Sequence, residues 1–203
     1  MAWSNAWKEK RFRLLVITGS IVFFAVLISF PFFFTYIEKR QGMIIHDRLL
    51  LLLPPYDVSI PTFIIIWSMT VLLWIRCVQD PGIFIVFLYG FILLSLSRMA
   101  TITLLPLDPP QGLIPLKDPL SSIFYGGMDV FIKKDLFYSG HTSIQLLMLF
   151  TFRKKSDKVL AFFSSLAIAS LVLVQHVHYT IDVAGALVFS YVVYRISRRI
   201  TGY

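Results

Sequence analysis

The sequence predicts an all-α integral membrane protein that folds as a bundle of six transmembrane helices. Two observations carry this prediction. The 203 residues are 57% hydrophobic and only 15% charged, far from the composition of a soluble domain. The apolar residues also gather in long stretches, with basic residues clustered beside them. No repeat and no second domain interrupts this pattern, so we expect residues 1–203 to form a single membrane domain.

A helix needs about 20 mostly apolar residues to cross the hydrocarbon of a bilayer. Six stretches are candidates, near residues 14–36, 60–77, 82–104, 137–152, 159–178 and 181–197. The fourth is the weakest, because it spans only if a polar Ser-Gly-His-Thr stretch forms its outer turn. The first resembles a signal peptide but is long and has no convincing cleavage site, so we expect it to be retained.

The basic residues predict the orientation of the bundle. The side that holds both termini carries about twice as many Lys and Arg residues as the other side, which places the termini in the cytoplasm. The loops 38–59 and 105–136 and the junction 178–181 then face the periplasm, the lumen or the exterior. The loop 105–136 is rich in proline and glycine, and we expect it to lie over the outer face as a lid or rim.

The composition also limits the partners. A net charge of +8 can indicate nucleic-acid binding, but the basic residues lie in short clusters beside apolar segments, as expected for contact with lipid headgroups. We therefore expect a lipid bilayer and no nucleic acid as the partner. Cys77 is the only cysteine, which excludes an intrachain disulfide and a metal site built from thiolates.

His178 and Asp182 are candidate catalytic residues at the start of the last span. They are four residues apart, so on a helix continuous across Tyr179 they share one face. The carboxylate can then hold one imidazole nitrogen and leave the other free as a nucleophile. His176 lies two residues away and points elsewhere on such a helix, so we expect a structural or supporting role for it.

His141 is the second candidate histidine, and it follows Ser139 and Gly140 at a predicted helix start. Unpaired N–H groups and the helix dipole favour a phosphate there, and the glycine lets it approach closely. Arg98, in the outer half of the third span, suits bidentate binding of phosphate oxygens.

Together these residues predict phosphoryl-group chemistry at a membrane surface. In this interpretation His178 is the nucleophile and Asp182 orients it. His141 transfers the proton, and Arg98 binds the phosphate oxygens. No nucleotide-binding loop and no acidic magnesium cluster accompanies them, so we expect no cofactor and no metal, and a covalent phosphohistidine is the economical mechanism. A metal site made from the same three side chains is a weaker alternative, because the histidine–aspartate pairing already uses the carboxylate.

The runs Tyr138-Ser139-Gly140-His141-Thr142 and His178-Tyr179-Thr180-Ile181-Asp182-Val183 resemble the sphingomyelin synthase branch of the phosphatidic acid phosphatase type 2 superfamily. Asp135 matches the aspartate before the family's serine-glycine-histidine motif. Arg98-Met99-Ala100-Thr101, followed by Leu105-Pro106, is similar to the arginine-containing segment and proline-bearing loop upstream. The resemblance covers the second half of the chain.

Four positions depart from related sequences. Lys133-Lys134 stands where animal sphingomyelin synthases carry Cys-Gly. Val172 stands where the lipid phosphatases of the superfamily carry an arginine, and Tyr138 stands where they carry a proline. The last two differences favour the synthase branch over a phosphate-monoester phosphatase.

The resemblance implies six helices with cytosolic termini, an outward-facing His-His-Asp triad, and transfer of a phospho-headgroup from a glycerophospholipid to a ceramide-like alcohol, with diacylglycerol as product. This is the sphingomyelin or ceramide phosphoethanolamine synthase type of reaction. Hydrolysis by the same triad, of a phospholipase C or lipid phosphate phosphatase kind, is an alternative. A non-enzymatic lipid-binding or transport protein is an alternative of another class.

The remaining expected substrate contacts surround the triad. Tyr138 and Tyr179 lie close to the two histidines in sequence, and Ser139, Gly140 and Arg98 are also expected to contact the substrate. Asp135 or Asp129 could face a cationic amine, whereas Lys133 and Lys134 could favour an anionic or inositol headgroup. The headgroup, the acceptor and the oligomeric state are therefore left open by the sequence, and His46 is expected to be solvated.

Overall fold

A computed structural model describes residues 2–117 and 132–203 of the chain. Within these ranges the secondary structure is helical, which confirms the all-α prediction, and only one isolated bridge, between Met43 and Leu107, has the strand-like pairing. Asp129, one of the two candidate contacts for an amine, lies outside the described residues. The elements are α1 (Trp3–Ala6), α2 (Lys10–Glu38), η1 (Leu50–Leu52), α3 (Ser59–Gln79), α4 (Pro81–Leu104), α6 (Gly140–Thr151), α7 (Lys155–Val174) and α8 (Thr180–Thr201).

Five of these helices are long and apolar enough to cross a membrane: α2, α3, α4, α7 and α8. The chain is therefore a multi-pass membrane protein, as predicted. The predicted span 137–152 differs, because α6 has only 12 residues. A helix of that length is about 18 Å long, against about 30 Å of hydrocarbon. The six-span count stays a prediction.

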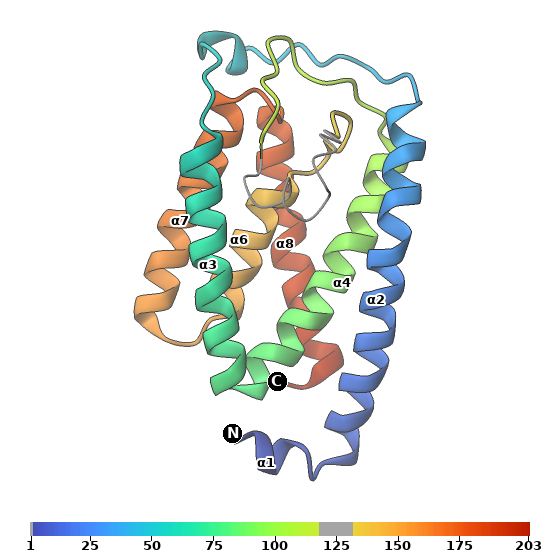
Figure 1. Cartoon of the computed structure of the whole chain (residues 1–203), viewed down its shortest axis with the longest axis vertical. Helices are drawn as coiled ribbons and strands as arrows, with labels where there is room; N and C mark the ends of the chain where they lie inside the picture. Colours follow the sequence, from blue (N-terminus) through green and yellow to red (C-terminus); the bar gives the residue numbers. More distant parts are fainter. Residues whose placement is uncertain (1, 118–131) are drawn as a thin grey trace.

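α6 is the central helix of the bundle. It packs against α7 and α8 and also contacts α4 and α3, whereas α2 lies on the outside against α4 (Figure 1). Gly90 of α4 allows close approach, because a Cβ atom there would lie 2.9 Å from the Leu147 side chain of α6. Leu147 itself is fully buried. The second half of α6 thus packs closely against α4.

Both termini lie at one end of the bundle, which we call the inner end (Figure 1). The indole of Trp3 donates a hydrogen bond of 2.8 Å to the carbonyl oxygen of Val78, which fastens the N-terminal segment to α3. At the same end, Arg76 of α3 binds Asp157 of α7 through two hydrogen bonds of 2.6 and 3.1 Å. That this end faces the cytoplasm stays a prediction.

Two loops cross the opposite end, which we call the outer end (Figure 1). Met43 of the first loop donates to the Pro106 carbonyl over 2.9 Å, and its own carbonyl accepts from Asp108 over 3.0 Å. A Cβ atom at Gly42 would lie 2.4 Å from the Leu107 carbonyl carbon, so only glycine fits there. The two loops therefore form one connected layer over the outer end.

Candidate active site

The imidazole of His178 lies beside the carboxylate of Asp182 at the outer end of α8. The Nδ1 atom is 3.3 Å from Asp182 Oδ2, and the two residues are 4% and 0% exposed. The same oxygen accepts the N–H of Tyr179 over 2.9 Å. Asp182 thus both caps the helix and orients the histidine.

α8 begins at Thr180, so no helix continues across Tyr179 and the chain breaks at the predicted junction 178–181. His178 lies before the helix, and Asp182 is its third residue. A carboxylate at this position reaches back over the first turn, which is how it meets both the Tyr179 amide and the imidazole. The predicted pairing is present, but it arises from a helix cap and not from one continuous helical face.

The start of α6 is joined directly to this pair. Ser139 is the N-cap of α6, and its Oγ accepts the N–H of Thr142 over 3.4 Å. The N–H of Ser139 donates to the main-chain carbonyl of Asp182 over 3.1 Å. His141 follows in the first turn, half-buried, with its ring edge-to-face with Phe63 of α3 at a centroid separation of 6.4 Å.

Arg98 of α4 lies against the same helix start. Its Nε donates to the Tyr138 carbonyl over 2.8 Å, and its Nη2 forms an ion pair of 2.7 Å with Asp135. A Cβ atom at Gly140 would lie only 2.6 Å from Arg98 Nη1, so glycine is required for this approach. The guanidinium is 14% exposed, which places a cation at the N-terminus of α6.

α4 also holds the segment before α6 through uncharged groups. The Thr101 hydroxyl donates to the Phe137 carbonyl over 2.9 Å. The Tyr138 hydroxyl lies 2.7 Å from Ser97 Oγ, and its ring stacks on Phe189 of α8 at 4.5 Å. Tyr138 is fully buried, so it fixes the segment between two helices, and its predicted contact with substrate stays a prediction.

This geometry brings Arg98, the start of α6 and the His178–Asp182 pair into one connected unit. Residues 134–199 match the family described as PAP2 superfamily C-terminal. The match supports the superfamily predicted from the motifs, whose members are generally phosphatases or phosphotransferases. It does not distinguish the sphingomyelin synthase branch. No match was found among the curated proteins or among the solved structures.

The segment that matches the PAP2 superfamily, residues 134–199 (called the PAP2 region below), is held from outside by Asp47, a residue to which no sequence motif pointed. Its carboxylate accepts the Thr180 N–H over 2.6 Å and the Thr180 hydroxyl over 3.1 Å, and so caps α8 from the first outer loop. Burial raises the pKa of Asp47, but hydrogen bonds led by that from the Thr180 N–H outweigh burial and lower it overall. Nothing in the local sequence connects residue 47 with residue 180.

Tyr179 connects the PAP2 region to both outer loops. Its hydroxyl donates to the Asp108 carbonyl over 2.9 Å and accepts the N–H of Ile45 over 3.3 Å. The side chain is 1% exposed. These contacts explain its position next to His178, while a contact between Tyr179 and substrate stays a prediction.

Lys133 and Lys134 lie at the start of the matched residues 134–199, with Lys133 just before them, near the end of α2. Their N–H groups donate to the Glu38 carboxylate over 2.6 and 2.7 Å. The ammonium group of Lys134 pairs with Asp108 at 2.8 Å and also donates to the Arg40 carbonyl. The exposed Lys133 is the better placed of the two to meet a headgroup.

His176 has a structural position in the turn before the PAP2 region's second motif. Its Nδ1 is 2.8 Å from the Gln111 carbonyl and its Nε2 is 2.9 Å from the Leu53 carbonyl. His176 therefore fastens both outer loops, whereas His46 is exposed, as expected.

Within residues 2–117 and 132–203, no three His, Cys, Asp or Glu side chains gather as metal ligands would. The arrangement offers a buried imidazole, an orienting carboxylate, a second imidazole and a guanidinium. Such groups suit nucleophilic attack on phosphorus and stabilisation of the charge on its oxygens.

Proposed function

We propose that this protein is a lipid phosphotransferase of the sphingomyelin synthase type, which moves a phospho-headgroup from a glycerophospholipid to a ceramide-like alcohol through a phosphohistidine on His178. The observation that carries the proposal is the buried His178–Asp182 pair, fixed through the Ser139–Asp182 main-chain bond to the helix start on which Arg98 lies. The PAP2 superfamily match supports lipid phosphatase or phosphotransferase chemistry.

In the first step, Asp182 accepts a hydrogen bond from the Nδ1–H of His178, which keeps the proton on Nδ1, so that Nε2 carries the free electron pair. Nε2 attacks the phosphorus, the phosphorus–nitrogen bond forms, and the bond to the diacylglycerol oxygen breaks. His141, protonated at this stage, donates its proton to the departing oxygen. The products of the step are diacylglycerol and a phosphohistidine that keeps the headgroup.

In the second step, the neutral His141 removes the proton of the acceptor hydroxyl. The acceptor oxygen attacks phosphorus, the phosphorus–nitrogen bond breaks, and His178 is released in its starting form. Arg98 and the N–H groups at the start of α6 meet the charge on the phosphoryl oxygens in both steps.

Hydrolysis is the second candidate, because the PAP2 superfamily match fits phosphatases as well as transferases. Water then takes the place of the alcohol in the second step. The donor is cleaved in the same way, and the phospho-headgroup is released free. The two candidates differ only in the acceptor.

Mass spectrometry of lipid products from the reconstituted protein separates the candidates. A phospholipid donor is supplied with and without ceramide, and we expect diacylglycerol and a new phosphosphingolipid only when ceramide is present. Free phospho-headgroup without any new sphingolipid would overturn the transferase and leave the hydrolase. Equal product levels from His178→Ala would overturn both, with His46→Ala as the control for changing an exposed histidine.

A further inference from the structure

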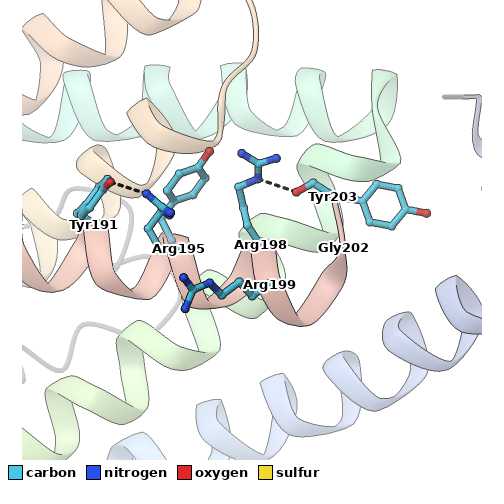
Figure 2. Close-up of a pocket in the computed structure, with 7 residues that line it drawn as sticks. Tyr191, Arg195, Arg198, Arg199, Gly202 and Tyr203 are labelled. Atoms are coloured by element: carbon cyan, nitrogen blue, oxygen red, sulfur yellow. Dashed lines mark hydrogen bonds between the residues drawn. The ribbon is translucent and has the colours of Figure 1, made fainter.

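Two adjoining cavities open at the inner end of the bundle, far from the candidate active site. The larger has a volume of about 650 Å³ and is lined mainly by the last two turns of α8 (Figure 2). The smaller, of about 440 Å³, lies beside it and shares Tyr194, Arg198 and Tyr203 with it. Arg195 is 13 residues beyond Asp182 on α8, which is about 20 Å along the helix axis. The cavities therefore do not belong to the candidate active site.

The walls of these cavities carry positive charge. Among the described residues that line them are five basic side chains and no acidic one. These are Arg153, Lys158, Arg195, Arg198 and Arg199. Arg153 has a carboxylate neighbour in Asp80 at 3.1 Å, which leaves the group as a whole strongly basic. Such a concave basic surface attracts an anion.

Two of the arginines are held in fixed positions. Figure 2 shows Arg195 and Arg198 on one side of α8, the first bound to the Tyr191 hydroxyl over 2.7 Å and the second to the Tyr203 carbonyl over 2.7 Å. Gly202, with φ of 79°, turns the chain so that the Tyr203 carbonyl returns to Arg198. Each guanidinium uses one donor in these bonds and keeps its other N–H groups for a ligand.

A neutral polar group also lines the smaller cavity. Thr151, the last residue of α6, is 6% exposed, and its hydroxyl has no hydrogen-bond partner among the described residues. A buried hydroxyl without a partner is uncommon and costs about 1–3 kcal/mol. A phosphate oxygen in the cavity is an acceptor of the kind that this hydroxyl lacks.

We propose that the inner cavities form a binding site for a phosphate group, distinct from the candidate active site. The site lies at the end of a membrane-spanning helix whose neighbouring residues Val192, Ile196 and Ile200 are 47%, 40% and 40% exposed. Acyl chains can lie along this apolar surface while the headgroup enters the basic cavity. An anionic phospholipid and soluble inorganic phosphate share the recognised chemistry, and the phospholipid also uses the apolar surface.

Binding measured in phosphatidylcholine nanodiscs tests the proposal. Dioctanoyl phosphatidic acid and dioctanoyl phosphatidylcholine are titrated separately, and the number of lipid molecules bound to each protein is determined by native mass spectrometry. Inorganic phosphate is then added as a competitor. We expect phosphatidic acid to bind and the double variant Arg195→Gln/Arg198→Gln to raise its Kd at least tenfold. Displacement by millimolar inorganic phosphate would identify a phosphate site open to both sources, and resistance to displacement would identify a lipid site.

The matched control is Lys10→Gln/Arg13→Gln, which removes the same charge at the same end of the bundle but outside the cavities. An equal loss of binding in this control would overturn the site in favour of a diffuse basic surface, as would no binding by the unaltered protein. Arg195→Lys/Arg198→Lys keeps the charge and should bind with intermediate affinity, which guards against a folding defect in the glutamine variant. His178→Ala should bind normally, so this test does not depend on the proposed function.

Discussion

The main-chain N–H of Ser139 donates to the main-chain carbonyl of Asp182 over 3.1 Å and so joins the two sequence motifs of the candidate site. One motif starts α6 and the other starts α8. Because the bond is made by the backbone, substitutions at either residue leave it in place unless residue 139 becomes proline. The relative position of the two helix starts is therefore set by the main chain.

Two substitutions of Ser139 should distinguish the contribution of its main-chain N–H from that of its Oγ cap. Ser139→Ala removes only the Oγ cap of Thr142 and should cost about 1 kcal/mol of stability with a small loss of rate. Ser139→Pro fits the backbone φ of −57° but also removes the N–H that binds Asp182, and should reduce turnover by a further tenfold or more. Equal turnover of the two variants would contradict the role of the backbone bond.

Asp182→Asn should reduce kcat by roughly 1,000-fold with little change in KM. The carboxylate oxygen that accepts both the Tyr179 N–H and the His178 Nδ1–H becomes an uncharged amide oxygen, and an NH2 group turned toward the ring donates to Nδ1, so the imidazole loses the tautomer required for attack. Steady-state kinetics on vesicles measure both constants. Asp57→Asn in the outer loop is the control, and unaltered turnover by Asp182→Asn would remove Asp182 from the mechanism.

Arg98 and Gly140 should behave as one unit. Gly140→Ala forces a Cβ to within 2.6 Å of Arg98 Nη1 and should displace the guanidinium, whereas Arg98→Lys removes the planar fork. Each change should lower kcat/KM by roughly 100-fold, since a lost charged contact in a transition state costs about 3 kcal/mol. In a double-mutant cycle the alanine should have less effect when residue 98 is lysine, and strict additivity would contradict the contact.

Asp47→Asn should destabilise the protein in a pH-dependent way. The pKa of Asp47 is lowered in the folded state, so its stabilising contribution is present above the ordinary value of 3.8 and is lost as the pH falls through the lower folded value. The difference in thermal stability between the variant and the unaltered protein should be constant near neutral pH and shrink below about pH 4. A difference that is equally large at pH 3 would contradict the capping role.

The sequence predicts much of the fold because hydropathy reports lipid exposure directly. Five spans follow from it, with bounds within a few residues of the helices. The length of α6 does not follow, because a Ser139 side chain that caps the helix, and not a change in hydropathy, decides where α6 begins. At the candidate active site, a polar side-chain cap and not the run of apolar residues thus decides where the helix begins.

The candidate site was predicted in part for similar reasons. His178 and Asp182 are near in sequence, so their pairing could be predicted, although a helix cap and not a shared helical face brings them together. The bond between Asp47 and Thr180 joins residues far apart in the chain, and no local pattern reports it. Arg98 and Asp135 were both predicted to meet substrate, and only the structure reveals their ion pair.

Gly140 packs against Arg98, which lies six residues before the end of α4, about 9 Å along the helix axis. If the outer end of α4 lies at the membrane surface, as the predicted orientation has it, Arg98 and the start of α6 lie below that surface. Under the proposed transferase function, an alcohol dissolved in the membrane would then reach the phosphorus by lateral diffusion, while water would have to leave its own phase to arrive. On that proposal the depth of the site would itself favour a lipid acceptor over water, without any side chain that recognises either.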